Sequence, residues 1–193
     1  APKESASKRR GIGGLFLVWH VAGAKAEQMA SLDEVVAVTN KANNNTRTVG
    51  VGLTSCIVPA NGQPTFTLPD DEMEIGLGIH GEPGIKRVKA RGIDSVIDEI
   101  VESILADLDY KGSDVALLVN GLGGSPAEEL YVVYRRVKQI CDANSINIRF
   151  KHVGEQVTAL EMAGVSVSLM RLDTEMHDLI TNSVVDTCMY KKI

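Results

Sequence analysis

The chain has 193 residues, of which 44% are hydrophobic and 23% are charged, and its formal net charge is −5. This length and composition are those of one ordinary globular domain, and they exclude a disordered or fibrous protein. Because the charge is negative and the lysines and arginines are scattered, there is no basic surface for a phosphate backbone, and we expect no nucleic acid partner.

The first part of the chain predicts a polar leader followed by two helices. Residues 1–9 are small, polar and charged, which is typical of a leader or linker. Within residues 10–29, apolar side chains recur at steps of three and four, the period of a helix. Ser31 and Glu34 form a capping-box pair that starts a second helix, and the asparagines at 43–45 suit its end.

The remainder of the chain predicts strands that alternate with helices. Strands are predicted from β-branched or continuous apolar runs at 46–54, 74–80, 115–119, 146–153 and 165–172. Helices are predicted from their period at 93–108 and 126–143, with a short candidate at 157–162, and turn residues predict a loop at 59–64. The alternation indicates an α/β fold, with a mixed or parallel sheet carrying helices on its faces, in one domain over residues 10–193.

The cysteines and the longest apolar run bear on cellular location. Cys56, Cys141 and Cys188 are an odd number at wide spacing, which favours a reducing cytoplasm over a disulfide framework. The apolar run at residues 12–24 is well short of the roughly 20 residues that a membrane-spanning helix needs. Nothing after it is typical of a secretory cleavage site, so we interpret the run as a buried helix and expect no membrane partner.

The segment from Asp70 to Gly84 carries the most information about chemistry. Alternate residues of a strand face opposite sides of a sheet, so one face would carry Ile75, Leu77 and Ile79. The other face would carry Glu72, Glu74, Gly76, Gly78 and His80. Glycines within a strand often mark the close approach of a ligand, so this second face leaves open space that leads to one imidazole. Glycines at positions 81 and 84 then let the chain turn sharply beside it.

A histidine in this setting has several possible roles. His80 could be a nucleophile, a general base or a metal ligand, and the structural alternative is a loop histidine held by hydrogen bonds. The nearby carboxylates of Glu74 and Glu82 favour chemistry at this position. The other histidines lie in unrelated segments without ligand spacing, so we expect no metal site built from this chain; they are His20, His152 and His177.

A second candidate is the glycine-rich turn at residues 120–126, whose N–H groups could hold an anion. Helix capping explains the same residues without a ligand, with Ser125 as the cap, Pro126 in the first turn and Glu128 in a capping box. The turn lacks the Lys-Ser/Thr ending of a P-loop and the full Gly-x-Gly-x-x-Gly spacing, so it gives little support for nucleotide binding. Any phosphoryl donor would then come from a partner.

Two stretches between residues 66 and 85 closely resemble the substrate-binding subunit of the dihydroxyacetone kinase family. They are Phe66-Thr-Leu and Glu72-Met-Glu-Ile-Gly-Leu-Gly-Ile-His-Gly-Glu-Pro-Gly-Ile85, in which the His-Gly-Glu-Pro-Gly part is highly specific. Supporting matches are Arg9-Arg10-Gly11, Val58-Pro59-Ala60, Val119-Asn120, Leu122-Gly123, Glu129-Leu130-Tyr131 and residues 160–172. The resemblance covers nearly the whole chain, but only the second half of the family's sequence is present.

The resemblance implies a kinase subunit in which His80 adds through a ring nitrogen to the carbonyl of dihydroxyacetone. The product is a covalent hemiaminal, which selects the ketone over glycerol and holds a terminal hydroxyl for phosphoryl transfer. Gly78, Gly81 and Glu82 are expected to bind the substrate beside His80. This chain is expected to hold no cofactor. The nucleotide, ADP or ATP with Mg, is expected on a partner L-type subunit fed by the phosphotransferase system.

The missing first half of the family's sequence limits what this chain is expected to do. In the family, that half carries a second glycine-rich loop ending in Ser-Gly-His-Glu-Pro, with a histidine and a later aspartate that act on the substrate. We find no counterpart, so the chain alone is expected to be inactive. The alternative function is a catalytically silent paralogue that binds dihydroxyacetone as a co-activator of a transcription regulator. The family pairs two such subunits, so a homodimer is expected.

Overall fold

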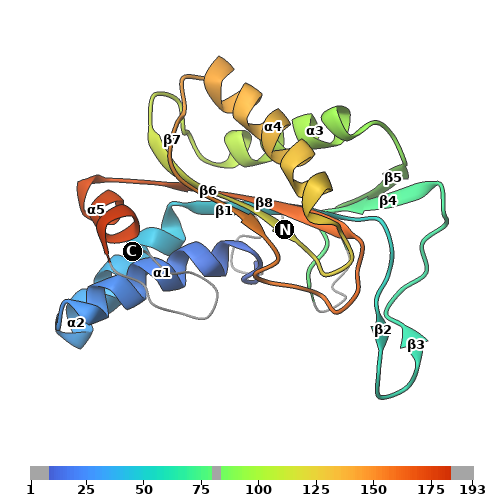
Figure 1. The fold of residues 1–193 in the computed structure, drawn as a ribbon, viewed down its shortest axis with the longest axis horizontal. Helices are drawn as coiled ribbons and strands as arrows, with labels where there is room; N and C mark the ends of the chain where they lie inside the picture. The colour runs from blue at the N-terminus through green and yellow to red at the C-terminus, as the bar shows by residue number, and fades with distance from the viewer. Residues whose placement is uncertain (1–8, 80–83, 184–193) are drawn as a thin grey trace.

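The structure is a computed structural model, and it describes residues 9–79 and 84–183. Its centre is a six-stranded sheet in the order β5-β4-β1-β8-β6-β7 (Figure 1). The strands of this sheet are β1 (Thr46–Gly52), β4 (Glu72–Ile75), β5 (Lys86–Lys89), β6 (Asp114–Gly121), β7 (Asn147–Gly154) and β8 (Gly164–Arg171). A small hairpin of β2 (Ile57–Val58) and β3 (Gln63–Pro64) projects from the body of the molecule (Figure 1).

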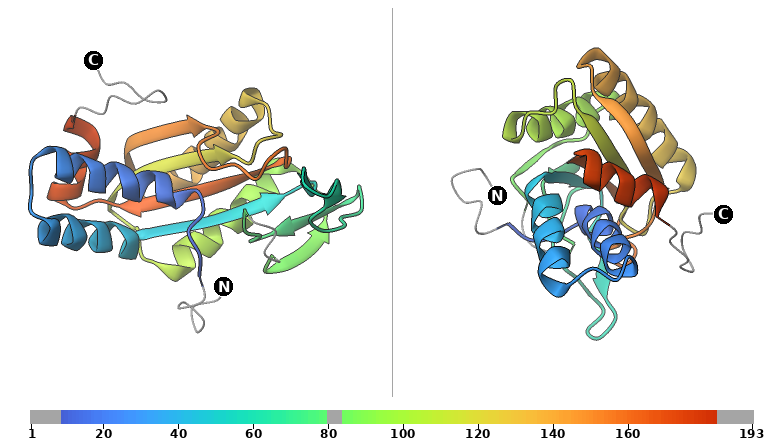
Figure 2. Two further views of the ribbon diagram at one scale, coloured as in Figure 1. Left: turned by 90° about the horizontal axis from the view of Figure 1, so that it is seen from below. Right: turned by 90° about the vertical axis from the view of Figure 1, so that its left-hand side faces the viewer.

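Helices cover both faces of the sheet (Figure 2). The helices of the described residues are α1 (Gly14–Glu27), α2 (Leu32–Asn44), α3 (Ile93–Asp107), α4 (Ala127–Ala143) and α5 (Thr174–Asn182). Helices α1, α2 and α5 lie on one face and α3 and α4 on the other. The sheet is mixed, because β6 pairs in parallel with β7 but antiparallel with β8, which also pairs antiparallel with β1. The predicted α/β fold is confirmed.

The two faces of the sheet have separate apolar cores. Alternate residues of β6 point to opposite faces, so Leu117 belongs to the core under α3 and α4, whereas Leu118 belongs to the core under α1, α2 and α5. A strand that is covered on both faces reads as a continuous apolar run, which is the pattern that predicted it. The capping box of α2 is also confirmed, with Ser31 Oγ accepting the N–H of Glu34 and the Glu34 carboxylate accepting the N–H of Ser31.

The predicted strand at residues 74–80 is wrong in most of its length. The strand β4 ends at Ile75, because Gly76 adopts a left-handed φ of +80° that breaks the extended backbone. The chain then returns as β5, which the sequence did not predict. Of its four residues Lys-Arg-Val-Lys, three are charged, a composition typical of an exposed edge strand and not of the apolar pattern used for prediction.

The short helix predicted at residues 157–162 is also wrong. Leu160 has a φ of +55°, which a right-handed helix does not contain, and the N–H of Ala159 donates to the carbonyl of Leu122 instead of within its own segment. Two elements were missed in addition to β5. The first is the β2–β3 hairpin, whose turn lies within the predicted 59–64 loop. The second is α5, at whose start the Asp173 carboxylate accepts the N–H of Met176 at 2.8 Å.

The last residue of the predicted leader is held against the domain. Both guanidinium nitrogens Nη1 and Nη2 of Arg9 donate to the carboxylate of Asp107 at 2.8 Å, and Arg47 donates to the same carboxylate. The Asp107 side chain retains 15% of its exposure. Arg9, and then Arg47, hold the pKa of Asp107 well below its usual range. These three residues form an N-terminal clasp between the start of the chain, β1 and the end of α3.

Asp107→Asn is expected to lower the free energy of unfolding by about 2 kcal/mol at neutral pH, because hydrogen bonds to charged groups contribute about that much. The pH dependence of this loss of stability follows from the lowered pKa of Asp107. The folded chain keeps Asp107 ionised where the unfolded chain takes up a proton, so the difference between the two proteins shrinks progressively below about pH 4. Urea unfolding at pH 7 and pH 3 measures both values.

A matched control is Asp142→Asn, which breaks the exposed ion pair of Asp142 with Lys138 within α4. This change is expected to cost less than about 1 kcal/mol at either pH, since exposed pairs are weak. Equal losses for the two variants at pH 7 would show that the N-terminal clasp contributes no more than a surface pair.

Candidate functional site

Several connections that are far apart in the sequence meet at one edge of the sheet. Here β1 and β6 end and β8 begins, since Gly52 pairs with Gly164 and Gly121 with Val165. We call this the loop edge and define it by residues 76–79, 120–126 and 155–164. A small apolar cluster packs the connections together, and its buried members are Cys56, Leu77, Leu122, Ala159 and Met162.

Of the predicted site residues, His80, Gly81 and Glu82 lie outside the described residues, so their arrangement stays a prediction. The residues on either side are described. Gly78 and Ile79 are half-buried, and Ile79 packs against the cluster of the loop edge. The chain on the far side of His80 is fixed by two hydrogen bonds: Gly84 N–H donates to Glu74 Oε1 at 2.6 Å, and Ile85 N–H donates to the Ile75 carbonyl at 2.7 Å.

Glu74 has a structural task in this arrangement. Besides accepting from Gly84, its carboxylate accepts from Arg87 at 3.2 Å, and its side chain is only 12% exposed. From the sequence, this carboxylate was expected near the imidazole, where it would favour chemistry. The described contacts instead make it the group that joins the two chain ends of the His80 segment, which fixes where that segment starts and returns.

Gly76 redirects the chain from one face of the sheet toward the loop edge. Its N–H donates to the Gly50 carbonyl at 2.6 Å, and an added Cβ would lie 2.6 Å from Cγ1 of Ile85. As a result Ile75 packs into the core under α3, whereas Leu77, two residues later, packs into the cluster of the loop edge. The two strand-face residues were predicted to share one core, and the left-handed turn separates them.

The glycine-rich turn has a structural explanation. The N–H groups of Leu122, Gly123 and Gly124 donate to the Gly164 carbonyl, the Glu155 carboxylate and the Met162 carbonyl, at 3.1, 3.1 and 2.9 Å. These three N–H groups are therefore already used within the chain and are not available to an anion. The turn serves to bind residues 155–164, and the structural interpretation is the one that the geometry supports.

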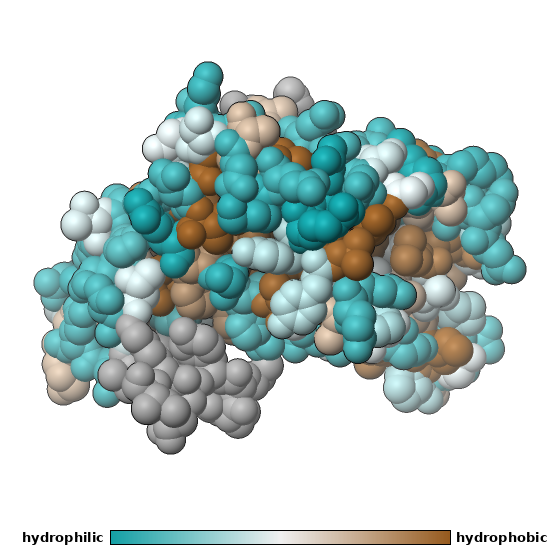
Figure 3. All heavy atoms as spheres, turned by 45° about the horizontal axis from the view of Figure 1, so that its top comes forward, coloured by the Kyte–Doolittle hydropathy of each residue, from teal (hydrophilic) through white to brown (hydrophobic). Residues whose placement is uncertain are grey.

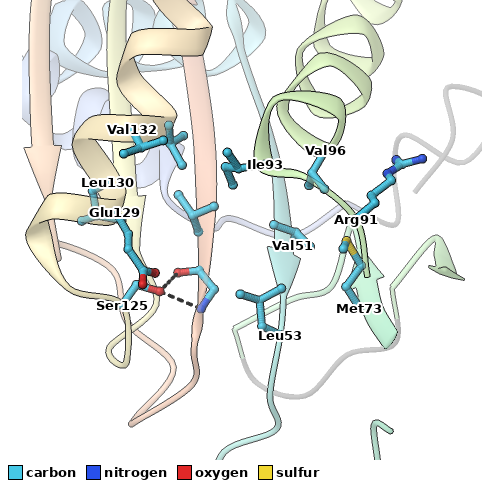
Figure 4. Close-up of a pocket in the computed structure, with 13 residues that line it drawn as sticks. Val51, Leu53, Met73, Arg91, Ile93, Val96, Ser125, Glu129, Leu130 and Val132 are labelled. Carbon is cyan, nitrogen blue, oxygen red and sulfur yellow. Dashed lines mark hydrogen bonds between the residues drawn. The ribbon is translucent and has the colours of Figure 1, made fainter. Parts of the chain in front are cut away.

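Ser125 does not cap α4, contrary to the prediction. The N-cap residue is Pro126, and no side chain accepts a cap hydrogen bond there. The hydroxyl of Ser125 instead accepts the N–H of Gly164 and donates to its carbonyl, each at 2.9 Å (Figure 4). A serine before a proline and an acidic first turn resembles a cap in sequence, but here it ties the start of α4 to β8.

A row of buried polar side chains crosses the sheet beneath α1. Asn120 is fully buried; its amide oxygen accepts the N–H groups of Gln156 and Val157, both at 2.9 Å, and its amide nitrogen donates to the Val157 carbonyl and Ser166 Oγ. Farther along, Thr48 donates to Ser168 at 2.8 Å. We call Thr48, Asn120, Ser166 and Ser168 the polar row; it lies against the start of α1, where a Cβ added to Gly13 or Gly14 would meet these side chains.

An apolar cavity of about 320 Å³ lies on the opposite face, between the starts of α3 and α4 (Figure 4). Its walls are mainly aliphatic, and they include Val51, Leu53, Val96, Leu130 and Val132. The guanidinium of Arg91, at its rim, points away from it (Figure 4). This cavity was not predicted from the sequence. The polar side chains of its lining are Arg91, Ser125 and Glu129, and the Ser125 hydroxyl is already bonded to Gly164, so we do not assign a three-carbon polyol or ketone to this mainly apolar cavity.

An open polar cleft of about 910 Å³ lies at the other edge of the sheet. Its charged groups pair with one another, as Lys41 does with Asp173 at 3.0 Å and Arg149 with Asp114 at 3.0 Å. Arg149 holds the pKa of Asp114 below its usual value through their hydrogen bond. His177 lines this cleft and is therefore far from the loop edge in the fold. We assign no ligand to the cleft.

Histidines and cysteines outside the His80 segment include His20, His152 and the buried Cys141. Among residues 9–79 and 84–183, no group of three or more His, Cys, Asp and Glu side chains is placed to hold a metal. His20 and His152 contact the ring of Phe16, and burial lowers the pKa of His152. Burial raises the pKa of the Cys141 thiol to about 11. In the same part of the chain, no helix has the length and apolarity to cross a membrane.

Comparison with known proteins identifies relatives over most of the chain. The family described as the Dak1 domain matches residues 1–188. A dihydroxyacetone-binding subunit of a PTS-dependent dihydroxyacetone kinase from Listeria innocua is 39% identical over 189 residues, which cover 97% of this chain and 57% of that protein. The corresponding subunit of the PEP-dependent kinase from Escherichia coli is 36% identical and covers 86% of this chain and 54% of that protein. The chain thus spans about half the length of these relatives.

Solved structures also match most of this chain. A dihydroxyacetone kinase operon co-activator superposes with a TM-score of 0.83 at 30% identity, over 88% of this chain and 53% of that chain. The dihydroxyacetone kinase from C. freundii, in complex with AMP-PNP and Mg²⁺, superposes with a TM-score of 0.78 at 31% identity, over 88% of this chain and 31% of that chain. A DegV lipid binding protein from Thermotoga maritima shares the fold alone, with a TM-score of 0.59 at 14% identity.

Proposed function

Because the chain belongs to the Dak1 domain family, we propose that it forms the ketone-capturing part of a dihydroxyacetone kinase. One observation carries the proposal: 97% of the chain aligns at 39% identity with a protein named as a dihydroxyacetone-binding subunit. The highly specific His-Gly-Glu-Pro-Gly stretch of the sequence lies within this range. Kinases acting on erythrulose are also among the relatives, at 39% identity, so short ketoses form the substrate class.

In the proposed reaction, His80 is the nucleophile. A neutral ring nitrogen attacks the carbonyl carbon of dihydroxyacetone, a carbon–nitrogen bond forms, and the carbonyl oxygen becomes a hydroxyl by taking up the proton that the ring loses. No group leaves. Glycerol has no carbonyl and cannot form this bond, so selection is chemical. Gly78, Gly81 and Glu82 are proposed to contact the bound ketone.

The described contacts support this role through positioning. The chain entering the His80 segment is held by Gly76 and by the packing of Leu77, and the chain leaving it is held by Gly84 and Glu74. A reactive group on a short connection with both ends fixed loses little freedom when it binds its substrate, and such preorganisation accounts for much of catalytic rate.

We propose that the phosphoryl donor is carried by a separate nucleotide-binding subunit of the L type, supplied by the phosphotransferase system. Four of the relatives are named as subunits of PTS-dependent or PEP-dependent dihydroxyacetone kinases. The N–H groups of the glycine-rich turn are used internally, so this turn does not provide a nucleotide site. The 193 residues span about half the length of these relatives, and we propose that they supply the part that captures the ketone.

The test is a native mass spectrum of the purified chain with dihydroxyacetone, with glycerol as the control ligand. We expect a mass increase of one whole dihydroxyacetone molecule, because hemiaminal formation releases nothing, and no increase with glycerol. An increase that is smaller by one water molecule would indicate a Schiff base on a lysine instead. Absence of any increase would mean that this chain does not capture the ketone by itself.

The second candidate function is a catalytically silent co-activator that binds dihydroxyacetone. It is favoured by the TM-score of 0.83 with the operon co-activator. The two functions differ in phosphoryl transfer. The whole protein to which these residues belong, combined with a nucleotide-carrying L subunit, would phosphorylate dihydroxyacetone if it is a kinase component. Ketone capture without any phosphorylation in this mixture would favour the co-activator.

A further inference from the structure

The cavity between the starts of α3 and α4 is apolar both inside and at its opening. Val51 and Val165 line it from the sheet and are buried. Three further lining residues form what we call the cavity mouth; they are Leu53, Ile93 and Val132, which are 44%, 39% and 42% exposed. Seen from the side that carries α3 and α4, the surface is mainly hydrophilic, and hydrophobic groups reach it in separate patches (Figure 3). Apolar side chains around an opening mark a place where an apolar ligand enters.

The walls of the cavity are tied to one another. Arg136 of α4 donates to both carboxylate oxygens of Asp98 of α3, at 2.7 and 2.8 Å. Arg135 of α4 pairs in the same way with Asp94, in the first turn of α3. On the side of the sheet, the lining strands β1 and β8 are paired along the full length of β1. The space is therefore formed before any ligand arrives, and a ligand that enters it does not have to order its walls.

The volume of the cavity sets the size of its ligand. Protein interiors contain few spaces larger than a water molecule, and water is held only where several polar groups surround it. An aliphatic cavity of about 150 Å³ stays dry and binds benzene. This cavity, at about 320 Å³, has room for about twice as many atoms, which corresponds to a chain of about ten carbon atoms with one polar end.

The polar side chains of the lining decide which polar end fits. The guanidinium of Arg91 pairs with Glu99 and points away from the cavity (Figure 4), so it does not hold a carboxylate there. The Ser125 hydroxyl is bonded to Gly164. Within residues 9–79 and 84–183, the Glu129 carboxylate forms no hydrogen bond or ion pair, and it extends from α4 toward Ser125 (Figure 4). An ionised carboxylate only accepts hydrogen bonds, so Glu129 favours a hydroxyl and repels a second carboxylate.

We propose that this cavity binds an uncharged aliphatic molecule of about ten carbon atoms with a hydroxyl group at one end. The aliphatic body lies between α3 and α4, and the hydroxyl donates a hydrogen bond to the Glu129 carboxylate. The proposal does not depend on the ketone chemistry, because Glu129 and the cavity mouth are not among the residues proposed to contact the ketone.

The first test places the ligand, with 1-decanol as the probe in isothermal titration calorimetry. One molecule is expected to bind per chain, with the negative heat-capacity change that marks burial of apolar surface. Val132→Trp fills the cavity mouth and is expected to weaken binding at least about tenfold, because losing room for about two methylene groups already costs that much. Ile93→Trp closes the mouth from α3 and should give the same loss, so the result does not rest on one variant. The control is Val36→Trp, at a 48% exposed valine of α2, which should bind 1-decanol as the wild-type chain does.

The second test examines the polar end, by comparing 1-decanol with decanoate, which has the same number of carbon atoms. Decanoate is expected to bind at least about tenfold more weakly, because it lacks the donor and carries a like charge. Glu129→Gln removes that charge and should narrow the preference at least about fivefold. The control is Glu128→Gln, which changes the neighbouring carboxylate outside the lining and should keep the preference.

Several outcomes would overturn the proposal. They are absence of 1-decanol binding, equal binding by Val132→Trp and Ile93→Trp, and equal binding of decanoate by the wild-type chain. The whole protein to which these residues belong should also bind 1-decanol, and loss of binding there would show that another part of the protein covers the cavity mouth. Ketone capture, measured by native mass on Val132→Trp, should be unchanged, so failure of this site and failure of the proposed function are distinguishable.

Discussion

His80→Ala is expected to abolish the mass increase with dihydroxyacetone completely while leaving the fold unchanged. Alanine has no nucleophilic nitrogen, so the covalent bond to the ketone carbon cannot form. The fold is expected to survive, because the three described apolar clusters and the hydrogen bonds of Gly76, Gly84 and Ile85 are made without residue 80. Native mass measures the adduct, and thermal unfolding followed by circular dichroism measures the fold.

The matched control is His177→Ala, which removes an imidazole at the cleft on the other edge of the sheet. Its mass increase with dihydroxyacetone should equal that of the wild-type chain. If His80→Ala keeps the increase, another nucleophile captures the ketone and the proposed role of His80 is wrong. If His80→Ala unfolds, the residue serves the structure, and its loss of adduct would say nothing about nucleophilic attack.

The parts of the fold that could be predicted are those whose local pattern and tertiary contacts agree. The predicted helix at 93–108 corresponds to α3 (Ile93–Asp107), because each apolar residue at helical spacing also faces the core. The predicted run at 115–119 lies within β6 (Asp114–Gly121) for the same reason. The charged edge strand β5 could not be predicted from apolar patterning, because its stability comes from pairing with β4 and not from burial.

The candidate site was predictable at the level of one segment and not at the level of its contacts. The glycines and carboxylates around His80 stand out in the sequence, but the use of Glu74 as a support for Gly84 depends on the return of β5. Asn120 stood out in the glycine-rich turn and in the family resemblance, but its role could not be predicted, because its partners lie at residues 156, 157 and 166, far along the chain. Sequence patterns report local structure, and contacts between loops require the topology.

The glycine-rich turn provides the second large effect. Gly123 has a φ of +118°, and an added Cβ would lie 1.8 Å from the carbonyl oxygen of Leu160. Because Leu160 belongs to the segment that Asn120 and Gly124 hold with hydrogen bonds, it cannot withdraw without breaking them. Gly123→Ala is therefore expected to lower the free energy of unfolding by at least about 3 kcal/mol, more than backbone strain alone commonly costs.

Gly112→Ala separates the collision from the backbone preference. Gly112 also has a left-handed φ, of +69°, but an added Cβ there meets nothing within 4 Å, so alanine is expected to cost only about 1–2 kcal/mol. Urea unfolding of both variants gives the difference directly. If Gly123→Ala costs no more than Gly112→Ala, residues 155–164 move aside freely, and the turn is not fixed by them. A larger loss for Gly123→Ala than for Gly112→Ala shows that Gly123 is required for the close approach of two loops. Phosphate binding is then not needed to explain the glycine-rich sequence.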